Sequence, residues 1–297
     1  MIGLSSSYHA MNGCSIYEAV SRAVDMGFDT VELGAAHTFE ENSAILPRKI
    51  RREFPNVSFT IHTLFPPLKE RAWFNPANGL TQVNMAIVDG LFEAAEEVEA
   101  RIVSLHPAVF NEVTIGHASD GKCYKPVVGG PINVEDGRKK FVELLGYAND
   151  RARATGTKLI VENMDAMFPD VYPQTKDEFM EVFKSFDGIG MLLDVGHALQ
   201  RGNLGEMLAL DGYIEEMHLH DVALTANGAT KGHFPIKDID YFKPFNGLRN
   251  MESMVLVFEH GPNVSQEEIL EEKELLETFL AGQINASPAC ARSPLAV

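Results

Sequence analysis

The alternation of short apolar runs with longer amphipathic stretches most restricts the fold of this 297-residue chain. Eight mostly apolar runs lie at residues 2–6, 30–33, 58–62, 101–106, 158–162, 190–194, 215–220 and 256–259. Stretches with helical periodicity separate them, such as residues 15–27, 79–98 and 135–156. Eight strands that each precede a helix predict an α/β protein with a single (β/α)8 (TIM) barrel over residues 1–280.

A doubly wound open sheet is the alternative fold. It would require a glycine-rich phosphate-binding turn after an early strand, and residues 3–13 contain no GxGxxG pattern. The barrel is therefore the preferred interpretation.

Two regions depart from the alternation. Residues 107–135 are rich in Gly, Pro, Asn and Asp, which predicts a loop over the barrel mouth. Within it, His117, Lys122, Tyr124 and Lys125 are either substrate contacts or solvated loop residues. Residues 281–297 are small, aperiodic and contain proline, which predicts a disordered C-terminal tail outside the fold.

Charge and composition narrow the choice of partners. The chain has 25 basic and 42 acidic residues, a formal charge of −17, and such a field repels nucleic-acid backbones. The basic cluster at residues 47–54 is interpreted as a helix with a solvated face. No run reaches the roughly 18 apolar residues of a membrane helix, and the N-terminus does not resemble a secretion signal, so we expect a cytoplasmic protein without membrane contacts.

The three cysteines, at positions 14, 123 and 290, show no paired CxxC spacing. This argues against a disulfide framework and against a cysteine zinc site. Any bound metal must therefore be held by His, Asp and Glu.

Six of the eight runs end on a residue type that binds metals. These residues are His62, His106, Glu162, Asp194, the pair His218 and His220, and Glu259. The C-terminal ends of parallel barrel strands open onto one shared face, and buried carboxylates are costly unless they are paired or bound to metal. The sequence therefore predicts a divalent metal site of Zn, Mn, Fe, Co or Mg at that face.

The strand-end pattern leaves two residue assignments open. Alternation along a strand places His218 and His220 on the same side, so periodicity does not decide which of them binds metal. Asp194, considered alone, could instead cap the helix that follows it, with His197 packed nearby.

The order of several motifs resembles the xylose isomerase-like barrel superfamily, which holds sugar isomerases, ketose epimerases, inosose-processing enzymes and abasic-site nucleases of the endonuclease IV type. The motifs are IVEN at 160–163, LDVGHA at 193–198, MHLHD at 217–221, HFPIKDID at 233–240, and FEH around Glu259. The resemblance extends from residue 2 to about residue 280.

The isomerase and epimerase members imply one divalent ion held by Glu162, Asp194, His218 and Glu259. His218 is preferred because the family histidine lies three residues before an acidic residue, here Asp221. By this resemblance, the chain is a metal-dependent isomerase or epimerase of a sugar or polyol, with or without a phosphate group. Family members are often homo-oligomers.

In this interpretation Glu162 and Glu259 act as base and acid on opposite sides of the ion, in a proton transfer through an enediolate. His197 and His233 would orient substrate oxygens or move protons.

The nuclease branch implies an alternative, a zinc phosphodiesterase acting on abasic DNA. Its extra metal ligands correspond to His62, His106, His197 and His233, and His220 is a further candidate for metal or substrate. Its pattern has an aspartate where this chain has Lys231, and the following motif is altered at Lys237 and Asp238. A barrel that binds a metal or ligand without catalysis is a third hypothesis.

Overall fold

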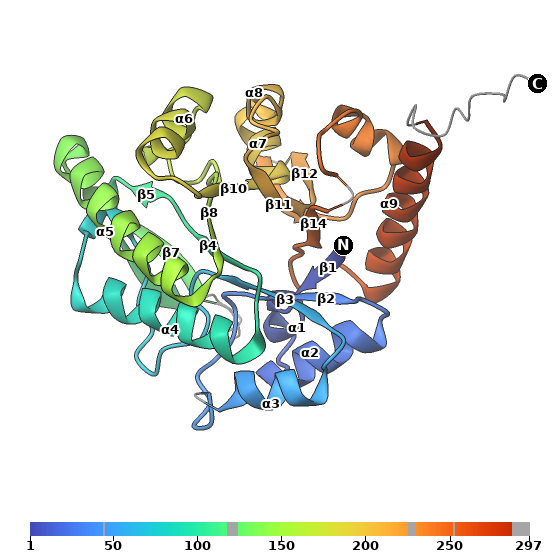
Figure 1. The fold of residues 1–297 in the computed structure, drawn as a ribbon, viewed down its shortest axis with the longest axis horizontal. Helices are drawn as coiled ribbons and strands as arrows, with labels where there is room; N and C mark the ends of the chain where they lie inside the picture. The colour runs from blue at the N-terminus through green and yellow to red at the C-terminus, as the bar shows by residue number, and fades with distance from the viewer. Residues whose placement is uncertain (44, 118–123, 225–229, 252, 287–297) are drawn as a thin grey trace, which may run out of the picture.

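A computed structural model describes the chain except residues 44, 118–123, 225–229, 252 and 287–297 (Figure 1). In the described part, eight parallel strands close into a barrel in the order β1-β14-β11-β10-β8-β4-β3-β2. Their bounds are β1 Ile2–Ser5, β2 Thr30–Leu33, β3 Ser58–His62, β4 Ile102–Leu105, β8 Lys158–Glu162, β10 Gly190–Asp194, β11 Ile214–Leu219 and β14 Val255–Phe258. Because β1 pairs with both β2 and β14, the sheet has no open edge, and the single (β/α)8 barrel is confirmed.

Helices surround the barrel (Figure 1). They are α1 Ser7–Met11, α2 Ile16–Asp25, α3 Leu46–Glu53, α4 Gln82–Val98, α5 Val134–Thr155, α6 Lys176–Ser185, α7 Val195–Arg201, α8 Leu204–Leu208 and α9 Gln266–Ala286, with 3-10 turns η1 Pro76–Asn78 and η2 Ile239–Phe245. Local sequence sets several boundaries. Ser15 and Thr175 form capping boxes with Glu18 and Glu178, and Gly156 ends α5 in the left-handed conformation. Among the described residues, no helix is both long and apolar enough to cross a membrane.

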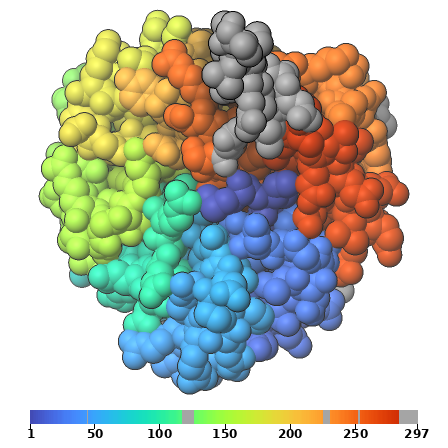
Figure 2. Space-filling view, turned by 45° about the vertical axis from the view of Figure 1, so that its right-hand side comes forward, coloured from blue at the N-terminus to red at the C-terminus, as the bar shows by residue number. Residues whose placement is uncertain are grey.

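The first and last βα units close the structure against each other. The N-terminal amine of Met1 donates to the Met254 carbonyl over 3.0 Å, and Lys273 of α9 donates to the Gly27 carbonyl over 2.8 Å. Figure 2 shows α9 beside the N-terminal elements on one face of the molecule. These contacts join the two ends of the barrel, so its strands form a continuous ring.

The barrel interior changes from apolar to polar. Ile102, Ile160, Leu192, Val255 and Val257 form an apolar cluster against which Met1 packs. Polar side chains on other strands, including Thr60, Glu32, Glu216 and His218, are completely or almost completely buried. Buried ionisable groups are costly unless they are paired or bound to a metal, so this polar layer is a candidate functional site.

Much of the described part of residues 107–135 forms strands where the sequence predicted a loop. β5 (Ala108–Val109) pairs with β9 (Val171–Tyr172), and β6 (Asn111–His117) pairs with β7 (Tyr124–Pro131) as an antiparallel hairpin. A register shift between Asn111 and Val113, together with the prolines and glycines of β7, hides the two-residue alternation that would reveal a hairpin. Lys122 and the side chains of His117, Tyr124 and Lys125 lie outside the described residues.

A second antiparallel hairpin, also not predicted, joins β12 (Asp221–Leu224) to β13 (Thr230–Phe234). At the C-terminus, α9 continues to Ala286, so the first six residues of the predicted tail are helical. The remaining part, 287–297, lies outside the described residues.

His37 gives the fold a pH dependence. Ser6 accepts the Gly34 N–H over 3.2 Å and its hydroxyl is 2.8 Å from Nε2 of His37, which is 2% exposed. Burial lowers the pKa of His37 to about 3, below the ~6.5 of an unfolded chain, so the unfolded state gains a proton first as pH falls. The stabilisation is therefore present above pH ~6.5 and is lost toward pH ~3.

Replacing His37 by Gln removes this titration. Between pH 7 and pH 4.5 the wild-type protein is expected to lose ~2–3 kcal/mol more unfolding free energy than His37→Gln. Urea unfolding of both proteins at the two pH values measures the difference. Equal losses would show that His37 takes up its proton without unfolding.

Candidate metal centre

The structure brings the four expected ligands together around one atom, Nδ1 of His218. The nearest oxygens are Oε2 of Glu259 at 3.1 Å, Oδ2 of Asp194 at 3.8 Å and Oε1 of Glu162 at 4.0 Å. Glu162 and Asp194 end β8 and β10, His218 lies in β11, and Glu259 directly follows β14. Donors from four strands thus meet at the C-terminal mouth of the barrel, where such folds place their reactive groups.

The donor set fits a divalent cation. Nδ1 of His218 and Oε2 of Glu162 are buried and make no hydrogen bond of normal geometry among the described residues. Three carboxylates with one imidazole nitrogen suit Zn, Mn, Fe, Co or Mg. Burial, with repulsion from Asp194 and Glu259, raises the pKa of Glu162 well above its usual range. A cation at the centre supplies the positive charge that would let Glu162 ionise.

The two roles considered for Asp194, helix cap and metal ligand, are compatible in the structure. It is the N-cap of α7, and its Oδ1 accepts the His197 N–H over 2.6 Å. Its other oxygen, Oδ2, faces His218. Although burial favours the neutral acid, His197 and His220 hold the pKa of Asp194 well below its usual range. Capping therefore fixes the carboxylate without occupying the oxygen that faces the centre.

Glu32 is a functional residue that the sequence analysis missed. Its Oε2 lies 2.7 Å from Nε2 of His218, and both side chains are buried. A carboxylate that holds one ring nitrogen of a ligand histidine directs the other nitrogen at the metal. The sequence pattern that identified candidate ligands was a metal-binding residue type at the end of a strand, and Glu32 comes one position before the end of β2. A charged residue at an inward position of an apolar strand was the available signal.

Glu216 was missed for the same reason. It accepts a hydrogen bond from Thr60 over 3.2 Å and lies 3.8 Å from Nε2 of His218. Burial, with repulsion from Glu32, raises the pKa of Glu216 to about 8.

Replacing Glu32 by Gln is expected to weaken metal binding about 10- to 100-fold, because the neutral amide holds the His218 ring less firmly and makes it a poorer donor. Titration of metal-free protein with Mn²⁺, with free Mn²⁺ followed by electron paramagnetic resonance, measures the affinity. Glu215→Gln is the matched control, because Glu215 lies in β11, the strand of His218, but its partly exposed side chain pairs with Lys158. An affinity equal to that of the control would contradict the role of Glu32.

A second donor group adjoins the first. Nε2 of His62 and Nε2 of His106 each lie 3.6 Å from Oε2 of Glu162, and 3.1 Å from each other. Ser104 holds Nδ1 of His62 over 2.6 Å, and Trp73 stacks on the His106 ring. Both strand-end histidines predicted from the sequence thus reach the carboxyl group of Glu162.

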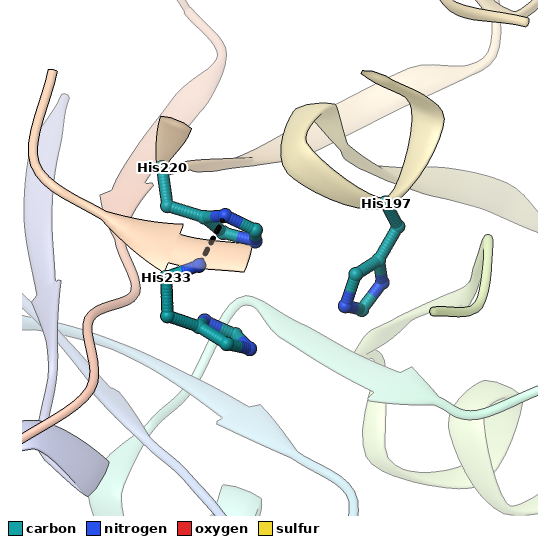
Figure 3. A group of neighbouring side chains, drawn as sticks. All are labelled: His197, His220 and His233. Carbon is teal, nitrogen blue, oxygen red and sulfur yellow. Dashed lines mark hydrogen bonds between the residues drawn. The ribbon is translucent and has the colours of Figure 1, made fainter. Parts of the chain in front are cut away.

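His197 and His233 also adjoin the centre, with Nδ1 of His197 3.5 Å from Oε1 of Glu162 and Nδ1 of His233 3.8 Å from Oε2 of Glu259. Figure 3 shows the two rings beside that of His220. Nδ1 of His197 lies 3.0 Å from the Asn163 carbonyl, and Nδ1 of His233 lies 3.0 Å from the Glu259 carbonyl. Because a carbonyl only accepts, each Nδ1 must carry the proton, which leaves a lone pair on each Nε2. Both rings can therefore accept a hydrogen bond or bind a cation through Nε2.

The family model for the xylose isomerase-like TIM barrel matches residues 20–279. Among curated proteins, an uncharacterized protein of Methanocaldococcus jannaschii is 21% identical over 160 residues, or 54% of this chain. The match spans 55%, about half, of that protein's length.

Solved structures share the fold at low identity. A D-tagatose 3-epimerase-like protein has a TM-score of 0.69 at 20% identity, covering 96% of this chain and 98% of that one. An L-ribulose 3-epimerase has a TM-score of 0.63 at 15% identity, covering 98% and 99%. The IolI protein with a bound zinc atom has a TM-score of 0.65 at 16% identity, covering 95% and 98%. Together with the barrel and its mouth of acidic and imidazole groups, the family match establishes that this chain belongs to the xylose isomerase-like TIM barrel family.

Proposed function

We propose that the protein is a divalent-metal-dependent isomerase or epimerase of a sugar or polyol. The observation that carries this proposal is the convergence of Glu162, Asp194 and Glu259 on Nδ1 of His218 at the barrel mouth. The structural relatives support it, since their names include a tagatose 3-epimerase-like protein, a ribulose 3-epimerase and a psicose 3-epimerase studied with D-fructose.

In this proposal Glu162 and Glu259 move a proton between the two faces of a substrate carbon. Glu259 follows β14, which adjoins β11 on one side, while Glu162 ends β8, which lies beyond β10 on the other side. They therefore flank the position of His218. A divalent cation held by Glu162, Asp194, His218 and Glu259 would polarise a substrate carbonyl and stabilise the negative charge that develops when a proton leaves the adjacent carbon. One glutamate removes the proton from the adjacent carbon, and the other returns a proton to the opposite face.

Their environments differ, which suits them to different roles. Burial raises the pKa of Glu162, whereas His218 and then His233 hold the pKa of Glu259 well below its usual range despite burial. Of the two glutamates, Glu259 is therefore the one whose environment favours the ionised form without a metal. His197 and His233 complete the site, because each offers an Nε2 lone pair to a substrate hydroxyl.

A panel of ketoses and inososes, incubated with Mn²⁺ or Co²⁺ and analysed by chromatography, tests the proposal. We expect conversion of at least one panel member, with dependence on the added ion. No conversion by protein whose metal content has been verified would overturn it.

A second candidate function is metal-assisted phosphodiester hydrolysis at abasic DNA. It is favoured by the group of His62, His106 and Glu162, which could hold an additional ion. The charge of −17 and the presence of Lys231 beside His233 oppose it. Elemental analysis separates the two, because one ion per chain supports the isomerase and three zinc ions support the nuclease.

A further inference from the structure

Both ring nitrogens of His220 are engaged within the protein, one by a backbone N–H and the other by a carboxylate. His220 follows β11 and is 0% exposed. Nδ1 lies 2.9 Å from the backbone N–H of His233, the bond drawn in Figure 3. Nε2 lies 3.1 Å from Oδ1 and 3.2 Å from Oδ2 of Asp194. The ring therefore connects the β12–β13 hairpin to Asp194, an expected metal ligand.

These contacts fix the tautomer of the ring. A backbone N–H can only donate, so Nδ1 of His220 must be unprotonated to accept the His233 hydrogen bond. The Asp221 carbonyl, 3.3 Å from Nδ1, cannot replace it, because that contact would need a proton on Nδ1. The neutral ring then carries its proton on Nε2 and donates it to Asp194. No lone pair remains for a cation, although the three histidines of Figure 3 are close enough to form a metal site.

Two glycines provide the space for the ring. A Cβ atom at Gly196 would lie 1.8 Å from Cε1 of His220, and one at Gly232 would lie 2.8 Å from the same atom. Gly196 is the second residue of helix α7, and any side chain there would displace the imidazole.

We propose that His220 is a positioning residue that couples Asp194 to the hairpin bearing His233. This rests on the proposed metal site at Asp194. The His197 N–H donates to Oδ1 of Asp194, and Nε2–H of His220 reaches both carboxylate oxygens and is hydrogen-bonded to Oδ2. Together these contacts fix the plane of the carboxylate, in which Oδ2 lies 3.8 Å from Nδ1 of His218. The His220 ring also holds His233, whose backbone is left-handed with φ 62°, a conformation that a side chain rarely adopts unaided. Loss of His220 therefore affects metal binding and the hairpin through separate atoms.

Two variants separate these contacts. In His220→Asn the side-chain oxygen reaches the position of Nδ1 and still accepts from His233, but nothing reaches Asp194. In His220→Gln the amide nitrogen reaches the position of Nε2 and still donates to Asp194, but the acceptor for His233 is lost. We expect His220→Asn to lower Co²⁺ affinity about 10- to 100-fold and to keep the His233 amide protected from hydrogen exchange. His220→Gln should bind Co²⁺ within about threefold of wild type and lose that protection.

His9→Asn is the control, because His9 is another buried histidine outside the metal-ligand groups of the described residues. Equal loss of Co²⁺ affinity in both His220 variants would indicate simple packing and overturn the proposal. Unchanged affinity in His220→Asn would overturn it as well.

Nitrogen-15 NMR of histidine-labelled wild-type protein tests the tautomer without any metal. We expect an unprotonated Nδ1 and a protonated Nε2 for His220, unchanged when Zn²⁺ is added. The opposite tautomer, or loss of the Nε2 proton with Zn²⁺, would overturn the proposal. If the wild type binds neither Co²⁺ nor Zn²⁺, the proposed function fails, while the tautomer and the His233 exchange still decide whether His220 links the two elements.

Discussion

Glu162→Gln is expected to lower kcat by about a thousandfold or more while the barrel remains folded. In the proposed mechanism Glu162 supplies both a ligand oxygen and a proton-transfer group, and a positioned acid or base alone contributes about 10²- to 10⁴-fold. Gln matches Glu in shape but cannot carry a proton to or from the substrate. The measurement is steady-state kinetics, at saturating Mn²⁺, on whichever panel sugar the wild type converts.

Stability distinguishes this loss from unfolding. Burial raises the pKa of Glu162 in the metal-free protein, so a neutral amide there should leave the melting temperature in chelator unchanged or higher. The control variant is Glu215→Gln, which changes a partly exposed side chain of β11 that pairs with Lys158. It should keep full activity. Activity of Glu162→Gln within tenfold of the wild type would show that another group transfers the proton.

Removal of divalent metal is expected to abolish turnover and to lower the melting temperature by about 5–10 °C. At an ion concentration 1,000-fold above Kd, binding stabilises the folded state by about 4 kcal/mol, and each kcal/mol shifts the melting temperature of a chain of this size by about 2 °C. The stabilisation arises because the cation offsets the repulsion among Glu162, Asp194 and Glu259. Thermal melts with EDTA, and after adding Mn²⁺ or Co²⁺, measure the shift.

Asp194→Asn provides the control for this experiment. It keeps a side-chain oxygen that can cap α7, yet it removes one negative charge from the group around His218. Its melting temperature should respond much less to added ion. An equal response in the variant and the wild type would place the stabilising ion elsewhere, and no response in either would contradict metal binding at this site.

The fold was predictable because the eight barrel strands coincide, within a residue, with eight short and mostly apolar runs of the sequence. The same signal gave the candidate residues at strand ends, such as Glu162 and Asp194 at the ends of β8 and β10, while the four-ligand set came from the resemblance to the family. The two hairpins were not predictable by this route, because a register shift in β6–β7 and glycine and proline in β7 interrupt the alternation.

The contacts that orient the expected ligands were the hardest part of the site to predict from the sequence. Glu32 meets His218 across 186 residues, and His220 meets Asp194 across 26 residues. Periodicity placed His218 and His220 on the same side of one strand but did not distinguish them. Only the contacts of their nitrogens do so: those of His218 face carboxylates on both sides, and Nδ1 of His220 accepts a backbone hydrogen bond.

Transfer of solvent deuterium to the substrate tests the central claim most directly. Each ketose or inosose of the panel is incubated in D₂O with the Mn²⁺-loaded protein, and exchange at the carbon beside the carbonyl is followed by NMR. We predict deuterium incorporation with the wild type, and none with Glu162→Gln or with EDTA-treated protein. Absence of exchange in every panel member, by wild-type protein with verified metal content, would contradict the account.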